Sequence, residues 1–220
     1  MNKPVSGLYA VTPELTDSIV LISKVDAALR GGASVVQYRS KSIADSLRRW
    51  QAREIVRLCR NWNALFIVND SVALAREVDA DGVHLGKDDG GVLAARAMLG
   101  PGKLIGVSCY NEIGRAREAV SQGADYVAFG SFFPSSTKPQ ALRAGTELLQ
   151  IAASEIALPV VAIGGITEDN AAGLIAAGAD AVAVVSALFD AIDVEAQARR
   201  FARLFQMPVN LVRCMHEIQK

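Results

Sequence analysis

The sequence has few of the residues on which several common protein classes depend. It contains three cysteines and two histidines in 220 residues, with no Cys-x-x-Cys spacing. An odd number of widely separated cysteines argues against a disulfide framework or a structural zinc site, and is typical of the reducing cytoplasm. There is also no histidine pair at metal-binding spacing, no Ser-His-Asp order and no nucleophile elbow.

Net charge and long apolar runs are lacking as well. Lys+Arg and Asp+Glu both number 23, giving a formal net charge of zero, which argues against a nucleic-acid partner. The N-terminal stretch MNKPVSGLYAVTPE has no apolar segment of the secretory type. The stretch closest to a membrane span, 171–189, is interrupted by Gly178 and Asp180 and divides into a helix and a buried strand. We therefore expect a soluble, cytoplasmic protein without a membrane partner.

What the sequence does contain is ample core material and a short repeat. Hydrophobic residues make up 51% and charged residues 21%, a composition without a disorder signature. Four segments place a small or acidic residue just before a short apolar run: RGGASVVQYRS, DADGVHLG, QGADYVAFG and AGADAVAVV. Each indicates a helix that ends at a residue able to adopt the left-handed conformation, followed by a strand.

Strands and helices are predicted to alternate along the whole chain. The predicted strands are 7–12, 35–40, 65–70, 82–86, 104–109, 126–131, 159–164 and 181–186. Helical spacing is clear in 43–60, 111–122, 168–177 and 194–205. Eight alternating units without a linker predict an α/β protein with a single (β/α)8 TIM-barrel domain over residues 1–220. Its core would span about 7–206, with 207–220 as a C-terminal tail. An open doubly wound sheet is the alternative.

Polar side chains gather where the predicted strands end. In a barrel of parallel strands these ends form one rim, where ligands bind. Gln37, Arg39 and Lys41 alternate along the second strand and therefore share one face. The other candidates at strand ends are Asn69, Asp70, Asp88, Asp89, Ser108, Ser135, Ser136, Thr137, Lys138, Gly164, Gly165, Val185 and Ser186.

Each of these residues also has a purely structural interpretation. Arg39 and Lys41 would pair with Asp45, while Asp70 and the pair 88–89 would cap the helices that follow. Gly164, Gly165, Ser136 and Thr137 would be turn residues, and Ser186 would be a helix N-cap. The shared location at one rim favours a ligand site instead.

His84 is interpreted separately, because histidine is the usual residue for proton transfer. It lies in the middle of a short predicted strand. A packed, hydrogen-bonded histidine is favoured over a catalytic one.

The charges at the rim indicate a magnesium–pyrophosphate ligand. Arg39, Lys41 and Lys138 would converge with Asp70 and Asp89, and carboxylates beside anion-binding cations suggest a divalent metal between them. Magnesium is typically held by one or two carboxylates together with substrate phosphates.

A second anion site is predicted beside the first. Gly165, Val185 and Ser186 would offer backbone N–H groups at helix starts, the common phosphate cradle of such barrels. Ser135 and Thr137 would lie between the two sites. No general base is indicated, so the reaction suggested is one in which pyrophosphate departs and a group that is already nucleophilic attacks.

Seven motifs in order resemble the thiamine-phosphate synthase family over about residues 7–205. They are QYRSK (37–41), VND (68–70), DGVHLGKDD (81–89), IGVSC (105–109), PSSTK (134–138), VVAIGGI (160–166) and AVVSAL (183–188). The resemblance implies a (β/α)8 barrel that joins 4-amino-2-methyl-5-hydroxymethylpyrimidine pyrophosphate to 4-methyl-5-(β-hydroxyethyl)thiazole phosphate. Thiamine phosphate and pyrophosphate would be the products of this Mg2+-dependent transferase.

The resemblance also implies roles for individual residues. Arg39, Lys41 and Lys138 would be catalytic, and Asp70 and Asp89 would bind Mg2+. The pyrimidine pyrophosphate would contact Gln37, Arg39, Lys41, Asn69, Ser108 and Lys138. The thiazole phosphate would face Ser135, Thr137, Gly165, Val185 and Ser186. Tyr38, Ser40 and Ser136 lie within the same motifs and are also substrate-binding candidates.

Two positions depart from the family pattern, which usually has glutamine at Lys87 and threonine at Ser135. Lys87 would either weaken metal binding at Asp89 or add a pyrophosphate contact. Two alternatives to the synthase are a thiazole tautomerase, for which His84 would be the proton-transfer residue, and a non-catalytic sensor of thiamine precursors.

Overall fold

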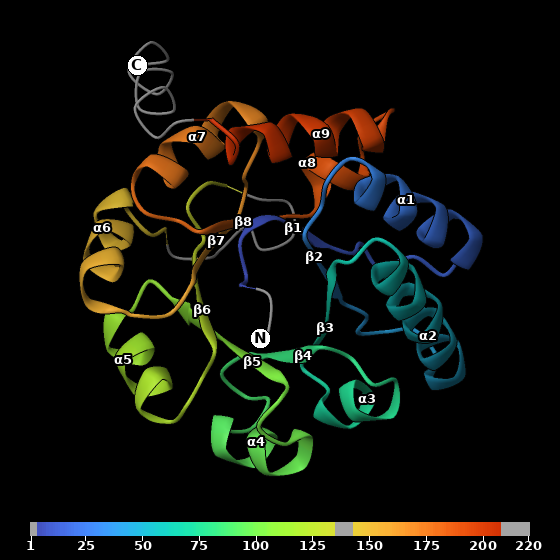
Figure 1. Cartoon of the computed structure of the whole chain (residues 1–220), viewed down its shortest axis with the longest axis horizontal. Helices are drawn as coiled ribbons and strands as arrows, with labels where there is room; N and C mark the ends of the chain where they lie inside the picture. Colours follow the sequence, from blue (N-terminus) through green and yellow to red (C-terminus); the bar gives the residue numbers. More distant parts are fainter. Residues whose placement is uncertain (1–3, 135–142, 208–220) are drawn as a thin grey trace.

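Eight parallel strands close on one another in sequence order, and the helices surround them (Figure 1). The computed structural model describes residues 4–134 and 143–207. The predicted TIM barrel is therefore confirmed, and the open-sheet alternative is wrong.

The strands are β1 (Gly7–Val11), β2 (Val35–Tyr38), β3 (Leu65–Asn69), β4 (Gly82–Leu85), β5 (Leu104–Tyr110), β6 (Tyr126–Phe129), β7 (Val160–Ile163) and β8 (Ala181–Val184). The helices are α1 (Ser18–Arg30), α2 (Asp45–Asn61), α3 (Val72–Glu77), α4 (Val92–Leu99), α5 (Ile113–Ser121), α6 (Thr146–Glu155), α7 (Glu168–Ala176), α8 (Ser186–Phe189) and α9 (Val194–Leu204).

Side chains along each strand alternate between the barrel interior and the layer beneath the helices. On β2, Val35 belongs to the interior cluster, whereas Val36 and Tyr38 pack in the outer one. Gln37 therefore points inward, where its amide donates a hydrogen bond to the Tyr9 hydroxyl. This alternation decides which residues of a rim motif can reach a ligand in the barrel mouth.

The short sequence repeat has a single structural cause. Three residues before each even-numbered strand the backbone is left-handed, at Gly32, Asp79, Gly123 and Gly178. The residue directly before the strand then bonds to the preceding strand. The three aspartates at this position, Asp81, Asp125 and Asp180, accept hydrogen bonds of 2.8, 2.7 and 2.8 Å from the backbone N–H groups of Phe66, Ile105 and Val160. The repeat thus ends a helix and ties neighbouring strands together.

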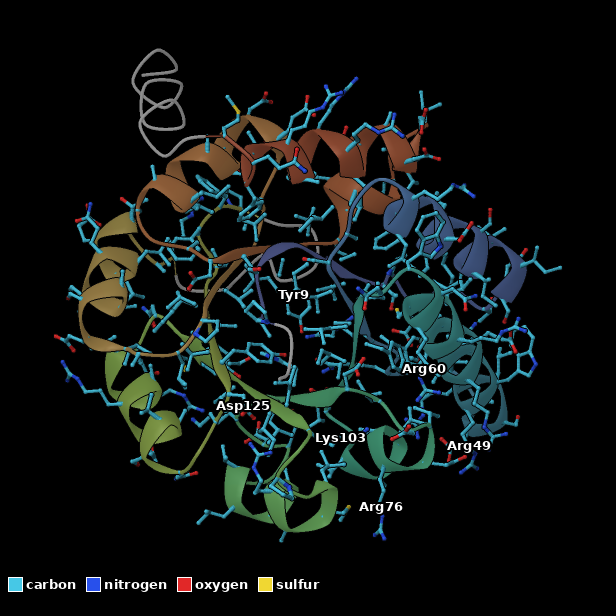
Figure 2. The ribbon with its side chains drawn as sticks, viewed as in Figure 1. Tyr9, Arg49, Arg60, Arg76, Lys103 and Asp125 are labelled. Carbon is cyan, nitrogen blue, oxygen red and sulfur yellow. The ribbon has the colours of Figure 1, made fainter. Side chains whose placement is uncertain are left out.

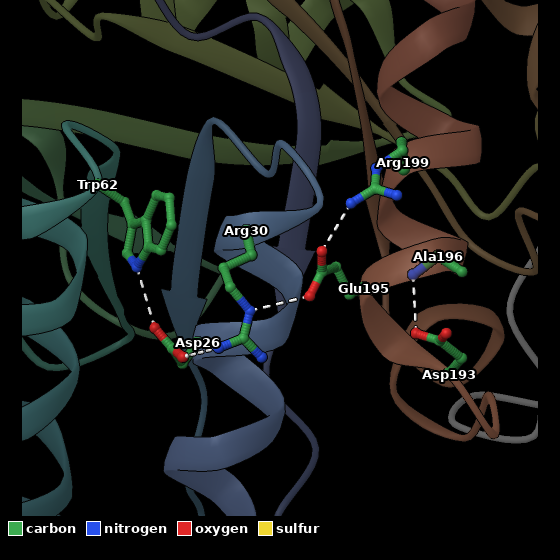
Figure 3. A network of polar contacts seen from close by, with 7 residues as sticks. All are labelled: Asp26, Arg30, Trp62, Asp193, Glu195, Ala196 and Arg199. Carbon is green, nitrogen blue, oxygen red and sulfur yellow. Dashed lines mark hydrogen bonds and ion pairs between the residues drawn. The ribbon is translucent and has the colours of Figure 1, made fainter.

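The ring of helices closes where α1 meets α9 (Figure 3). Arg30 on α1 donates to Glu195 on α9 at 2.9 Å and to Asp26 at 2.6 Å. Trp62, directly after α2, donates its indole N–H to Asp26 at 2.9 Å. Since these charges are partly exposed, each ion pair adds little to the stability of the protein. They link three neighbouring helices by specific contacts.

The observed elements match the predicted ones closely except at strand ends. Seven of the eight predicted strands run one or two residues past the observed end, because the chain leaves the sheet early to form the rim loops. The apolar stretch 171–189 divides into a helix and a strand as predicted, α7 and β8, and its last residues form the short helix α8. In the described parts of the chain, no helix has the length and apolar character needed to cross a bilayer. The predicted tail beyond Met207 lies outside the described residues.

Gly106 on β5 leaves room inside the barrel for a tyrosine ring from the next strand. A Cβ atom at Gly106 would lie 2.0 Å from Cζ of Tyr126, which is its register partner on β6. Because the ring is fully buried, we expect Gly106→Ala to lower the free energy of unfolding by about 2–3 kcal/mol. Chemical denaturation measures this.

Gly114 supplies a matched control on α5, where an added Cβ would meet nothing within 4 Å. Gly114→Ala should stabilise the protein slightly, because alanine is the better helix former. Equal stability changes in the two variants would contradict the tight packing inferred at Gly106.

Candidate functional site

The structure brings two of the three predicted cations, Arg39 and Lys41, together with the predicted carboxylates at the C-terminal mouth of the barrel. Lys41, after β2, has its Nζ 3.7 Å from Oδ2 of Asp70, after β3. Asp70 in turn interacts with Asp89, after β4, and with the charge of Arg39. Asp45, the structural partner suggested for Arg39 and Lys41, instead pairs with Arg48 at 2.8 Å. Residues from three successive strand ends thus form one cluster.

Asp70 and Asp89 form a carboxylate pair suited to a divalent cation. Burial raises the pKa of Asp70, and the hydrogen bond and negative charge of Asp89 raise it further, while Lys41 and Arg39 act in the opposite direction. Two adjacent carboxylates are unfavourable unless a proton or a cation lies between them. Across residues 4–134 and 143–207 no third acidic, histidine or cysteine ligand joins them, which matches magnesium held mainly by substrate phosphates and water.

Neither carboxylate acts as a helix cap, so their structural interpretation is wrong. Ser71 is the N-cap of α3 and accepts a hydrogen bond from the Leu74 N–H. Gly91 is the N-cap of α4, with no side-chain capping bond. Asp89 instead accepts a 2.8 Å bond from the Gly86 N–H.

The backbone at Asp70 is itself unusual, with φ at +63°. A non-glycine residue pays a strain of about 1 kcal/mol or more in this left-handed region, and such residues cluster at functional sites. Asn69, the last residue of β3, is half-buried at the same strand end. The strained turn therefore places both residues at the mouth.

Two residues that the sequence did not single out hold the loop after β2. The buried hydroxyl of Thr12 accepts a 2.9 Å bond from the Arg39 N–H. The Glu14 carboxylate accepts bonds from the backbone N–H groups of Lys41 and Ser42 and from the Ser42 hydroxyl, and these bonds lower its pKa, Ser42 contributing most. Both residues sit in the loop after β1, where TPE has the composition of any turn. Nothing in the sequence distinguishes their role.

The second side of the mouth is built where β6, β7 and β8 end. Gly165 has φ at +64°, and a Cβ there would lie 2.3 Å from the carbonyl oxygen of Pro134. Only glycine fits where the loop after β6 passes over the end of β7. Val185 is the N-cap of α8 and Ser186 its first residue, and both are half-buried. Ser135, Ser136, Thr137 and Lys138 lie outside the described residues.

Tyr38 is not brought to the mouth, although it lies between Gln37 and Arg39 in the sequence. Its side chain is 2% exposed and its hydroxyl donates to Gln51 on α2 at 2.8 Å. Ser40 is on the same side, near enough to the Tyr38 hydroxyl to affect its pKa, which burial raises. Strand alternation explains both positions, because every second side chain of β2 faces the helices. A direct side-chain contact between Tyr38 and a ligand in the mouth is therefore not available.

His84 is a packed and hydrogen-bonded residue, as predicted. It is 6% exposed. Its Nδ1 is 3.1 Å from the Tyr126 hydroxyl and its Nε2 is 2.9 Å from the Ser108 hydroxyl. Ser108 is half-buried and lies nearer the rim, so it separates His84 from the mouth. Lys87, the departure from the family pattern, is exposed.

A family model, relatives matched by sequence and a solved structure indicate the same family. The family model for thiamine monophosphate synthase matches residues 8–188, well over half of the chain. Thiamine-phosphate synthase of Methylobacillus flagellatus is 56% identical over 92% of this chain and 96% of its own length. That of Aromatoleum aromaticum is 54% identical over 90% and 96%. Among solved structures, thiamine phosphate pyrophosphorylase from Pyrococcus furiosus superposes with a TM-score of 0.82 at 36% identity, covering 94% of this chain and 96% of that one.

Proposed function

Because the chain belongs to the thiamine monophosphate synthase family, we propose that its barrel mouth joins a pyrimidine pyrophosphate to a thiazole phosphate. The substrates are 4-amino-2-methyl-5-hydroxymethylpyrimidine pyrophosphate and 4-methyl-5-(β-hydroxyethyl)thiazole phosphate, and the products are thiamine phosphate and pyrophosphate. The observation that carries this assignment is the cluster of Arg39, Lys41, Asp70 and Asp89 from three neighbouring strand ends.

The pyrophosphate side of the site uses this cluster. Asp70 and Asp89 would hold Mg2+, which would supply charge neutralisation for the pyrophosphate. Arg39 and Lys41 contact the same oxygens, with their loop held in place by Thr12 and Glu14. Lys138, Asn69, Gln37 and Ser108 complete the contacts to the pyrimidine pyrophosphate in this proposal.

The thiazole phosphate takes the other side of the mouth. Gly165, Val185 and Ser186 lie there at the ends of β7 and β8, and Ser135 and Thr137, with Ser136 beside them, complete the contacts. The tight passage of Phe133 and Pro134 over Gly165 supports this arrangement, since it brings the start of the loop after β6 to the end of β7.

The chain's residues promote loss of the leaving group rather than proton abstraction. Electron release from the 4-amino group weakens the bond between the pyrimidine methylene carbon and the pyrophosphate oxygen, and this bond breaks as negative charge develops on pyrophosphate. Arg39, Lys41 and Lys138 stabilise that charge. The thiazole nitrogen then attacks with a lone pair it already owns, so His84 is not required as a base and remains a structural residue.

A cytoplasmic location also belongs to this proposal. Cys59 and Cys109 are free and buried, and burial raises the pKa of the Cys109 thiol to about 12. Reduced, unreactive thiols of this kind suit a compartment in which disulfides do not persist.

A single assay tests the proposed function. Purified protein is mixed with both phosphorylated precursors and Mg2+, and thiamine phosphate and pyrophosphate are quantified together. We expect equal amounts of the two products, and none after chelation of the metal. A folded sample without turnover would reject the synthase in favour of a sensor, while isomerised thiazole phosphate without pyrophosphate release would indicate a tautomerase.

A further inference from the structure

Five polar side chains form a continuous row of hydrogen bonds through the barrel interior. Gln37 Nε2 donates to Tyr9 Oη at 2.8 Å, and Tyr9 Oη lies 2.9 Å from Tyr126 Oη. Tyr126 Oη lies 3.1 Å from His84 Nδ1, and His84 Nε2 lies 2.9 Å from Ser108 Oγ. The members come from β2, β1, β6, β4 and β5 in that order. Tyr9 is labelled inside the ring of strands in Figure 2.

The two ends of the row approach the mouth and its middle lies deeper. Gln37 is the last but one residue of β2, and Ser108 lies near the end of β5. Tyr126, in contrast, is the first residue of β6. Tyr9 and Tyr126 are 1% and 0% exposed, so water does not compete for their hydroxyls.

Both phenols remain protonated, because burial raises the pKa of Tyr9 and of Tyr126 far above neutral pH. Each phenol therefore has one hydrogen to donate and accepts one in return. Tyr9 receives the Gln37 N–H, so its own hydrogen goes to Tyr126. The Tyr126 hydrogen then goes to His84 Nδ1, which leaves the imidazole hydrogen on Nε2, directed at Ser108.

The group that Gln37 presents at one end of the row, donor or acceptor, therefore determines which group Ser108 presents at the other end. One N–H of the Gln37 amide is used on Tyr9, and this orientation leaves the amide oxygen, the only acceptor of the side chain, for a ligand. Ser108 accepts from His84, so its own hydrogen is available for a ligand. Reversing the row requires the Gln37 amide to turn, and then the amide offers N–H while Ser108 offers a lone pair. In either direction, the mouth presents one acceptor and one donor.

We propose that Tyr9, Tyr126 and His84 are positioning residues that orient Gln37 as a hydrogen-bond acceptor and Ser108 as a donor, and so select an aminopyrimidine. This inference rests on the proposed function, which places the pyrimidine beside Gln37 and Ser108. An aminopyrimidine carries an amino donor next to a ring-nitrogen acceptor, the complement of this pair. A 4-oxopyrimidine carries the opposite pattern. Its carbonyl acceptor would face the Gln37 acceptor and its ring N–H donor would face the Ser108 donor, unless every hydrogen bond of the row reverses.

Binding of two unreactive analogues tests the proposal without the chemical step. The probes are the monophosphates of the 4-amino and 4-oxo forms of the hydroxymethylpyrimidine, titrated by calorimetry. Wild-type protein should prefer the amino form by about a hundredfold. Tyr126→Phe and Tyr9→Phe each break the row, which frees the two ends to orient independently, so the preference should fall by about tenfold.

Tyr38→Phe is the matched control. Tyr38 is an equally buried tyrosine that also loses one hydrogen bond, to Gln51, but it lies outside the barrel interior. Its amino-to-oxo ratio should stay at the wild-type value. An equal fall in the control, or an unchanged ratio in folded Tyr126→Phe and Tyr9→Phe proteins, overturns the proposal.

The imidazole reports the direction of the row. The chain has two histidines, so the nitrogen-15 spectrum of a His216→Gln variant reports on His84 alone. We expect neutral His84 with its hydrogen on Nε2, and a hydrogen on Nδ1 would overturn the stated direction.

Wild-type protein that forms thiamine phosphate but binds both analogues equally overturns this inference alone. Preferential binding of the amino analogue without turnover overturns the proposed function alone.

Discussion

Replacing Arg39 by alanine should lower kcat by about a hundredfold or more. The guanidinium lies among the charges around Asp70, and its backbone N–H is fixed by the buried Thr12 hydroxyl. A preorganised donor directed at charge that develops on a leaving group contributes about 10²–10³ in rate. Steady-state turnover with both substrates saturating measures the effect. Arg39→Lys should recover only part of it, because an ammonium cannot form the paired contacts of a guanidinium.

Arg53→Ala is the control for lost positive charge. Arg53 is exposed on α2 and pairs with Glu77 on α3 at 2.9 Å, away from the strand ends. Its kcat should match that of the wild type within about twofold, as surface substitutions usually have small effects. If Arg39→Ala is as active as Arg53→Ala, Arg39 does not act on the leaving group.

Replacing Asp89 by asparagine should raise the Mg2+ concentration needed for half-maximal activity by about tenfold or more. The change removes one charge of the Asp70–Asp89 pair but keeps an oxygen that can accept the Gly86 N–H bond. Loss of a supporting group around a metal costs about 10–100-fold in affinity, and loss of a direct ligand should cost at least as much. Activity titrated with Mg2+, together with calorimetric titration of Mn2+ into the protein alone, measures the change.

Asp88→Asn is the matched control, because Asp88 is the exposed neighbour of Asp89 and carries the same charge. Its Mg2+ titration should resemble that of the wild type. If Asp89→Asn also leaves the Mg2+ titration unchanged, Asp89 serves only to anchor the loop at Gly86.

Sequence patterns located most of the candidate site and placed Gln37, Arg39 and Lys41 on one face of the second strand, but Tyr38 and Ser40 were still kept as substrate-binding candidates. The motif QYRSK contains five consecutive candidates, and the structure turns Gln37 into the barrel while Tyr38 packs against α2. Strand periodicity predicts such a division. The motif as a whole obscured it, because resemblance to a family assigns a motif without assigning a direction to each side chain.

The residues that hold the ligand-binding side chains and loops in place were missed for a different reason. Tyr9 and Tyr126 lie in apolar strands, where an aromatic residue is most simply core. They are 117 positions apart in the chain, and their hydroxyls meet 2.9 Å apart only because β1 and β6 line the same interior. Glu14 and Thr12 are equally inconspicuous, since the backbone groups they bind belong to another loop.

The sequence by itself determined the alternation of strands and helices, the end of the barrel at which polar residues collect, and the family. These follow from local periodicity, from left-handed residues such as Gly123 and Gly178, and from motifs read in order. Only the tertiary structure decided that Asp70 and Asp89 share a site instead of capping helices, and that Tyr9, Tyr126 and His84 connect Gln37 to Ser108. Contacts of that kind depend on the closure and stagger of the barrel, which bring distant strands together at hydrogen-bonding distance.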